Sequence, residues 1–411
     1  MSLLSNRRRF LKISAGAAAS ALGILSDAVA ARPLLKNPCL SPELNDASVN
    51  AWLTRVWEGL DPAQVWDCHV HLTGTGDSGK GPEMGPMLTS LWHPLLNIQR
   101  LFYLNASCSR GAAAVDDNYV ARLAAQVQNM PSGFKAMLLA FDWFCDASGN
   151  PVPKQSTFYI PNDYARTVAA ANPALFEWVA SIHPYRPDAV DRLHEAAESG
   201  ARAVKWLPSA QNIDTAAPRC EAFYAALAQL KLPLIVHGGE EKATEAKELQ
   251  HLGNPLRLRR ALAAGVRVVV AHCAGAGVDD DLDKPGTRQP SFALFARLME
   301  NPEWQSNLRG DISAILLRNH KTEVIKALLA REDWHDRLLN GSDYPLPGVI
   351  PLTSPRALAA NGLLPEDAIA PLETLREHSA LYFDFAVKRL LAWQGKSFPA
   401  SVFETRQFFE T

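Results

Sequence analysis

Eight short apolar segments recur along this chain, and their alternation with helix-like segments limits the possible folds more than any other feature. Each segment is rich in Val, Ile, Leu or aromatic residues, as in strands that are buried on both faces of a parallel sheet. The segments span residues 65–72, 134–141, 178–183, 201–207, 233–237, 266–272, 308–314 and 337–342.

Segments with helical periodicity lie between most of these predicted strands. They span residues 162–171, 188–199, 220–230, 243–264, 292–300 and 321–330. Strands that alternate with helices, without a second core pattern, predict an α/β protein that folds as a single-domain (β/α)8 TIM barrel. A doubly wound open sheet is the alternative.

The connection after the first predicted strand is unusually long. Residues 73–133 separate the first two strands, and a connection of this length usually carries structure of its own. We expect an insertion over the barrel mouth, with helices near residues 87–103 and 117–130. Residues 371–392 predict a closing helix. The expected limits are therefore 32–395 for the barrel and 396–411 for a C-terminal tail.

The N-terminus has the features of an export signal. Arg7 and Arg8 precede a weakly apolar run over residues 13–29, and Ala-Val-Ala at residues 28–30 fits a small-x-small cleavage site. The run is too short and too polar for a membrane span. The pattern predicts a twin-arginine signal peptide over residues 1–31, so the twin-arginine export machinery would deliver the protein to the periplasm without stable membrane insertion.

Composition restricts the classes of partner. With 47% apolar residues and a formal net charge of −2, the chain has no electrostatic basis for binding nucleic acid. Its six cysteines form no C-x-x-C pair, which argues against a zinc ribbon or a redox dithiol, and the sequence does not rank their disulfide pairings. We expect a small-molecule substrate, and we leave open whether the protein is a homo-oligomer.

The first predicted strand carries two histidines on one face. Strand residues alternate between faces, so His69 and His71 point to the same side about 6.5 Å apart and can share a metal ion. Barrels of this kind place catalytic groups at the carboxyl ends of their strands. The side chains of this kind at later strand ends are Lys205, His237, His272 and Asp343. Five strands thus predict one metal site at the barrel rim.

Five motifs, in order along the chain, carry a family resemblance. They are DCHVH at residues 67–71, VK at 204–205, IVHGGE at 235–240, AHCAG at 271–275 and GSDYP at 341–345. Through these motifs the chain resembles the amidohydrolase superfamily, and most of all its amidohydrolase-related (amidohydrolase 2) branch of metal-dependent barrel hydrolases and decarboxylases. The resemblance extends over residues 65–385.

The resemblance implies a divalent metal ion, with zinc as the expected element and one or two ions per chain. The residues that would hold or flank the metal are His69, His71, Lys205, His237 and Asp343. His272 would be a further ligand or a base that orients water, and Asp343 would move a proton from the attacking water to the leaving group. Lys205 either bridges two metal ions after carboxylation or, unmodified, pairs with the substrate.

These features predict a hydrolase that uses metal-activated water to cleave an amide, ester or lactone bond of a small molecule. Two alternatives remain: a metal-dependent non-oxidative decarboxylase on the same barrel, and a non-catalytic periplasmic protein that binds a metal or solute. A serine hydrolase is disfavoured because the chain has no G-x-S-x-G motif.

Four other residues near the predicted rim have two interpretations each. His183 and Arg186 either bind a substrate carboxylate or belong to a turn. Glu240 and Glu241 either orient a metal ligand or lie in a solvated loop. We interpret the remaining histidines, including His320, as ordinary surface or helix residues.

Overall fold

The computed structural model describes residues 36–44, 46–244 and 247–410. The predicted export signal at residues 1–31 lies outside these ranges. Within them, no helix combines the length and the apolar character that crossing a membrane requires.

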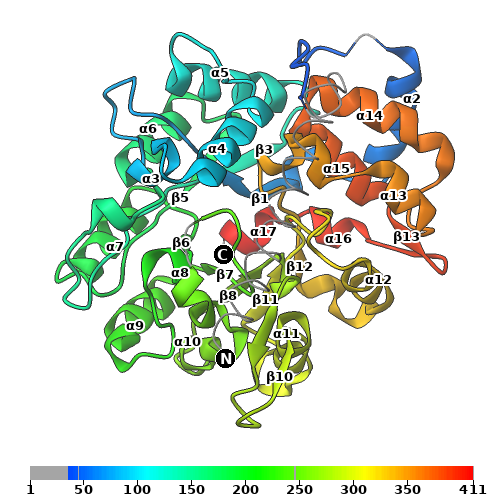
Figure 1. Cartoon of the computed structure of the whole chain (residues 1–411). Helices are drawn as coiled ribbons and strands as arrows, with labels where there is room; N and C mark the ends of the chain where they lie inside the picture. The colour runs from blue at the N-terminus through cyan, green and yellow to red at the C-terminus, as the bar shows by residue number, and fades with distance from the viewer. Residues whose placement is uncertain (1–35, 45, 245–246, 411) are drawn as a thin grey trace, which may run out of the picture.

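In the described part of the chain, eight parallel strands form the centre of the molecule (Figure 1). Three of them pair in the order β1-β3-β5 and five in the order β12-β11-β8-β7-β6. Parallel bridges connect the two sheets at both edges, between Ala180 and Val204 and between Val70 and Tyr344. The ring is therefore closed. This confirms the predicted (β/α)8 barrel and excludes the open sheet, because an open sheet keeps two unpaired edges.

All eight predicted strands are present, most of them shorter than predicted. The barrel strands are β1 (Trp66–His71), β3 (Lys135–Leu139), β5 (Phe176–Val179), β6 (Val204–Trp206), β7 (Leu234–His237), β8 (Val268–Ala271), β11 (Leu308–Asp311) and β12 (Leu338–Leu339). The third strand lies earlier than predicted, because the chain leaves the sheet after Ala180 and turns at Pro184.

Alternating strand residues divide the core into an interior and an outer layer. Inside the ring, buried side chains form a cluster that contains Trp66, Met137, Ile235 and Val269. Residues of the opposite strand faces, such as Val70, pack in the larger core cluster against the helices.

The segment expected to be a C-terminal tail is folded onto the barrel. It contains β14 (Lys396–Ser397), α16 (Ala400–Phe403) and α17 (Arg406–Glu410). Phe409 joins the interior cluster, and the Thr405 hydroxyl donates a hydrogen bond of 2.7 Å to the carbonyl of Trp66, the first residue of β1. These residues therefore cover the amino-terminal end of the barrel, and α17 lies near the centre of the ring in Figure 1.

Helices surround the ring. They are α6 (Asn162–Ala171), α7 (Ala189–Glu198), α9 (Glu221–Leu230), α10 (Arg259–Ala263), α11 (Ser291–Glu300), α12 (Thr322–Ala330), α14 (Ile369–His378) and α15 (Ala380–Leu390). The remaining α-helices outside the insertion and the C-terminal segment are α2 (Ala47–Trp57), α8 (Pro208–Gln211) and α13 (Pro355–Ala360), and the other short strands outside the barrel are β2 (Glu83–Met84), β4 (Phe158–Tyr159), β9 (Val278–Asp280), β10 (Arg288–Pro290) and β13 (Ala392–Trp393).

Two helix predictions are wrong. In the described part of residues 243–264, only the short α10 is an α-helix, and 3₁₀ turns at Lys247–Gly253 and Pro255–Leu258 precede it, because Pro255 disfavours helical backbone in the residue before it. The predicted closing helix is two helices, α14 and α15. Its break is at Ser379, whose side chain accepts a hydrogen bond from the Tyr382 N–H and so caps α15.

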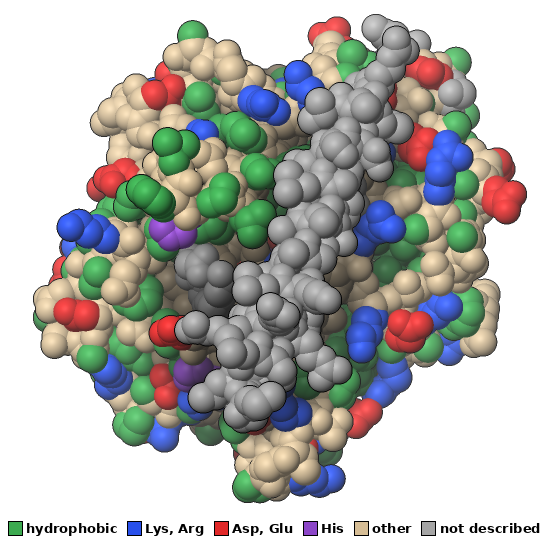
Figure 2. Space-filling view, in the orientation of Figure 1, with side chains coloured by type: hydrophobic (Ala, Val, Ile, Leu, Met, Phe, Trp, Pro, Cys, Tyr) green, Lys and Arg blue, Asp and Glu red, His purple; other side chains and the backbone are tan. Residues whose placement is uncertain are grey.

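The insertion after β1 contains α3 (Pro86–Thr89), α4 (Pro94–Ala106) and α5 (Val115–Gln128). A disulfide between Cys39 and Cys108 connects the end of α4 to the segment that precedes α2, and Asn37 and Asn105 exchange two hydrogen bonds beside it. Figure 2 shows hydrophobic side chains over α3 and α4, where Trp92 is 91% exposed.

Candidate metal centre

Among the described residues, a group of seven neighbouring imidazole, amine and carboxylate side chains lies at or just beyond the carboxyl ends of the barrel strands. His69 and His71 are in β1, Lys205 is in β6, His237 ends β7, His272 follows β8, Asp311 ends β11, and Asp343 follows β12. Six of them are the residues singled out from the sequence, and the fold brings these six together. The seventh, Asp311, was not predicted.

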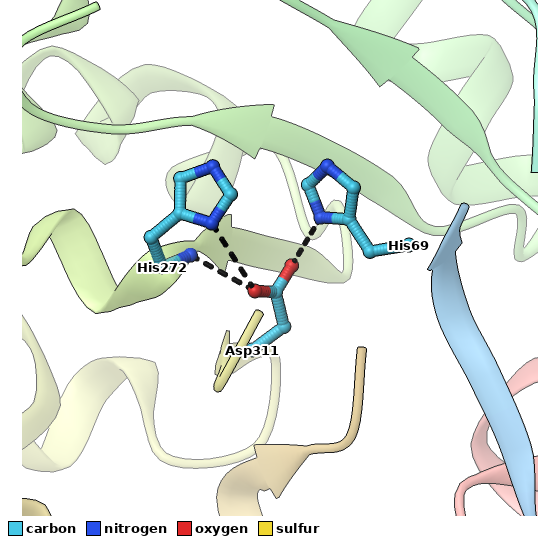
Figure 3. A group of neighbouring side chains, drawn as sticks. All are labelled: His69, His272 and Asp311. Atoms are coloured by element: carbon cyan, nitrogen blue, oxygen red, sulfur yellow. Dashed lines mark hydrogen bonds and ion pairs between the residues drawn. The ribbon is translucent and has the colours of Figure 1, made fainter. Parts of the chain in front are cut away.

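Asp311 connects two of the histidines. Its Oδ2 lies 2.9 Å from His69 Nδ1, and its Oδ1 accepts a hydrogen bond of 2.9 Å from the backbone N–H of His272 (Figure 3). Burial raises the pKa of Asp311, but the charge and hydrogen bond of His69 outweigh this effect and hold the pKa well below its usual range. The ionised carboxylate therefore keeps the His69 proton on Nδ1, so that Nε2 presents its lone pair to a metal.

His272 is oriented in a similar way. Its Nδ1 lies 3.1 Å from the carbonyl of Ser313 and 2.8 Å from the Ser313 hydroxyl, which itself donates to Asp311. The carbonyl can only accept, so it favours a proton on Nδ1 and leaves Nε2 with a lone pair. Burial holds the pKa of His272 well below its usual value, so the ring is neutral at pH 7.

Asp343 lies against both histidines of β1. Its Oδ1 is 3.0 Å from His71 Nε2 and 3.5 Å from His69 Nε2, and its N–H donates to the His69 carbonyl at 2.8 Å. Burial raises the pKa of Asp343, but the His71 hydrogen bond and the neighbouring imidazoles hold it well below the usual range. This carboxylate is therefore ionised at neutral pH. A Cβ at Gly341 would lie 2.7 Å from the Cβ of His69, so only glycine allows this close approach.

His237 completes the group of imidazoles. Its Nε2 is buried without a hydrogen-bond partner among the described residues, while its Nδ1 lies 3.4 Å from a carboxylate oxygen of Glu241. Burial, followed by the charge of Lys205, lowers the pKa of His237 to about 4. A neutral imidazole with an unpartnered buried nitrogen is suited to a metal ion, since an orphaned buried polar atom is otherwise costly.

Lys205 lies at the base of this group. It is 1% exposed, and its Nζ is 3.0 Å from His69 Nε2, the nitrogen that Asp311 leaves free. Burial lowers the pKa of Lys205 to about 8. Its amine is therefore placed where either carboxylation or displacement would let a cation reach His69.

The backbone around the centre is strained. Non-glycine residues rarely adopt positive φ, yet φ is 57° at His272, 49° at Cys273 and Ala274, 51° at Ala314 and 63° at Asp343. Such residues cost about 1–3 kcal/mol each and usually persist at functional sites. Three of these five residues directly follow β8, and their backbone conformation places the His272 ring beside Asp311.

Two sets of residues offer ligand atoms within 4.8 Å of one another among the described residues: His69, His71 and Asp343, and His69, His272 and Asp311. In the second set, hydrogen bonds already occupy both oxygens of Asp311. We therefore interpret this carboxylate as a group that orients His69 and His272 and does not itself bind a metal. The first set, with the free nitrogens of His237 and His272 beside it, fits a divalent ion with nitrogen and carboxylate ligands.

The other residues near the predicted rim are placed differently. His183 is fully buried, with its Nε2 2.8 Å from the Gln211 carbonyl and its Nδ1 accepting from the Tyr185 N–H. Arg186 pairs with Asp188 at 3.2 Å and lines a cavity of about 450 Å³ between α6 and α7, outside the barrel. This turn therefore gives neither residue a hydrogen bond to the metal-binding group.

Comparison with known proteins supports a family assignment. The family model described as amidohydrolase matches residues 66–377. No curated protein matches the chain.

Solved structures resemble this chain at low sequence identity. An uncharacterised TIM-barrel protein from Bordetella bronchiseptica is 18% identical, with 76% of this chain and 98% of that chain covered and a TM-score of 0.45. A candidate 2-pyrone-4,6-dicarboxylic acid hydrolase from Pseudomonas putida is 18% identical, with 84% and 97% covered and a TM-score of 0.42.

A third structure, 5-carboxyvanillate decarboxylase from Novosphingobium aromaticivorans with bound manganese, is 10% identical, with 86% and 99% covered and a TM-score of 0.42.

Proposed function

Because the chain belongs to the amidohydrolase family, whose members are metal-dependent enzymes, we propose that it hydrolyses an amide, ester or lactone bond of a small molecule with a divalent metal ion. The observation that carries the proposal is the ionised Asp343 carboxylate, 3.0 Å from His71 Nε2, beside histidine nitrogens that other hydrogen bonds leave free. This arrangement would provide a metal site and a base in one place, which supports the proposal.

We assign the ligand set from the group of ligand atoms that lie within 4.8 Å of one another and from the buried His237 nitrogen that has no partner among the described residues. His69, His71, His237 and Asp343 would hold the ion, and Lys205 would join them if it is carboxylated. The buried, unpartnered Nε2 of His237 supports this assignment. When bound, a divalent ion lowers the pKa of water towards 7 and polarises a carbonyl group. Zinc is the element we propose, because imidazole and carboxylate ligands suit it.

Asp343 would move the proton in this reaction. Its carboxylate accepts a proton from the water whose oxygen adds to the substrate carbonyl carbon. It then donates that proton to the nitrogen or oxygen that leaves when the C–N or C–O bond breaks. His272, with Nδ1 held at Ser313, would accept a hydrogen bond at Nε2 and orient the water.

The proposal is tested on the purified full chain, loaded in turn with zinc and manganese. Bound metal is measured by elemental analysis, and turnover on a panel of esters, lactones, amides and aromatic carboxylates. We expect bound metal and hydrolysis of at least one ester, lactone or amide. Release of carbon dioxide from an aromatic carboxylate, without hydrolysis, would replace the proposal with decarboxylation. A chain that holds metal but turns over nothing would favour a binding protein.

Matched histidine variants test the ligand set. His69→Ala and His71→Ala should each lower bound metal, whereas His335→Ala should not. His335 is also buried, but its Nε2 lies 3.1 Å from the Leu328 carbonyl, in the 3₁₀ turn that precedes β12. Full metal occupancy in both β1 variants at limiting metal would refute the site.

We also propose that the protein is exported to the periplasm by the twin-arginine machinery. The Cys39–Cys108 disulfide supports export, because disulfides persist in oxidising compartments. Exchanging Arg7→Lys together with Arg8→Lys should leave the precursor in the cytoplasm. Undiminished periplasmic protein in this double variant would defeat the assignment.

A further inference from the structure

His320 is a buried histidine beside the metal centre, not the surface residue that the sequence suggested. It lies in the loop that leads from β11 to α12, where its N–H donates to the Leu317 carbonyl at 2.8 Å. The residue is only 9% exposed, and its ring is perpendicular to that of His272, with 6.1 Å between the ring centres. The loop that follows Asp311 therefore brings a second residue to this side of the centre.

Gly275 forms part of the pocket for this imidazole. A Cβ on Gly275 would lie 2.6 Å from His320 Nδ1, closer than two such atoms can approach. Gly275 has helical backbone angles, φ −69° and ψ −10°, which any residue can adopt. Glycine is therefore required at position 275 because it has no side chain, and not because of its backbone freedom.

The surroundings of Nδ1 indicate the tautomer of the ring. Nδ1 is buried without a hydrogen-bond partner among the described residues. A proton on Nδ1 would leave a buried N–H without an acceptor against the Gly275 backbone, so the proton belongs on Nε2. His320 thereby offers one hydrogen-bond donor, Nε2–H.

We propose that His320 binds the substrate, donating a hydrogen bond from Nε2 to a carbonyl or carboxylate oxygen that lies beside His272. The inference rests on the proposed function to the extent that the substrate binds at this metal centre. The unpartnered Nδ1 of His320 lies against Gly275 and is therefore closed to a metal ion, and among the described residues His320 belongs to neither set of ligand atoms within 4.8 Å of one another. Because the ring is neutral, its Nε2–H can donate a hydrogen bond to an uncharged carbonyl oxygen as well as to a carboxylate.

Binding of acetohydroxamate to the zinc-loaded full chain tests this role without turnover. The probe has two oxygens that can bind a metal and accept hydrogen bonds. Calorimetry would compare wild type with His320→Ala, His320→Asn and His320→Gln. The amide nitrogen of Gln reaches about as far as Nε2, whereas that of Asn reaches only about as far as Nδ1. The Gln variant therefore retains the proposed donor and the Asn variant does not.

We expect the affinity for acetohydroxamate to fall about 3- to 10-fold in the Ala and Asn variants, to stay near wild type in the Gln variant, and bound zinc to remain unchanged. Gly275→Ala should also weaken binding, because it displaces the His320 ring without removing it. His335→Ala serves as the control for loss of a buried histidine.

Equal probe affinity in wild type and His320→Ala would overturn the proposal. So would equal losses in the Gln and Asn variants, or a loss of zinc that accounts for the weaker binding. If no compound of the panel is hydrolysed but the probe affinities follow the expected order, the role of His320 stands and the proposed reaction fails.

Discussion

Replacing Asp311 with Asn tests whether this carboxylate prepares the metal ligands. The variant keeps the size of the side chain and one oxygen. That oxygen can still accept from the His272 N–H, which now lies 2.9 Å from Oδ1, and from the Ser313 N–H at 3.0 Å. The new amide NH2 group then takes the position of Oδ2, 2.9 Å from His69 Nδ1.

Two donors would face each other across that contact. His69 can relieve the conflict by moving its proton from Nδ1 to Nε2, which removes the lone pair needed for a metal, or by donating from Nδ1 to the Ser313 hydroxyl oxygen 3.1 Å away, a weaker acceptor than a carboxylate. A hydrogen bond to a charged group contributes about 1.5–3 kcal/mol, equivalent to roughly 10- to 100-fold in affinity. We therefore expect zinc affinity to fall by about this factor.

Zinc affinity would be measured by competition with a chelator of known affinity. Asp279→Asn is the control, because Asp279 is also buried and accepts a hydrogen bond of 2.7 Å from the Ser291 hydroxyl, but lies in β9, away from the centre. It should bind zinc as wild type does. An Asp311→Asn protein that is folded and binds zinc within about twofold of wild type would refute the reasoning.

Three further predictions follow from the site and the fold. Asp343→Asn should keep most of its metal and lose about 10²–10⁴ in turnover on any substrate found, and unchanged turnover would show that another residue is the base. Lys205→Ala should lose metal and regain activity with added short carboxylic acids if Lys205 is carboxylated, whereas full metal content would assign it to substrate binding. Cys39→Ser should lower the free energy of unfolding by about 4 kcal/mol, since the disulfide closes a long loop; an unchanged urea midpoint would contradict this.

Sequence periodicity was sufficient for the barrel and for the expectation that six of these side chains meet at one rim. Strand and helix patterns are local, and in a parallel barrel every strand ends at the same rim. A polar residue at the end of a buried strand is therefore placed by topology alone. This is why His237, His272 and Asp343 could be expected beside His69 before any contact was known.

Asp311 does not follow from this rule, because the sequence pattern places it inside a predicted strand and not at its end. It lies within the seventh predicted strand, 308–314, and the structure ends that strand at Asp311. When the end of the strand is not known, an Asp between Gly310 and Ile312 is not recognisable as a residue of the barrel rim. Periodicity gives the face on which a strand residue lies but not the residue at which the strand ends, so it does not identify which polar residue of the strand reaches the rim.

Only the tertiary structure decided which residues pair across long separations. His69 and Asp311 are 242 residues apart, and His320 lies against Gly275 although the loops that carry them follow different strands. The same holds for the Cys39–Cys108 disulfide and for Phe409 inside the barrel. Periodicity indicates on which face of its helix or strand a residue lies. The partner on that face depends on how distant elements meet, and this is determined by packing of the whole ring.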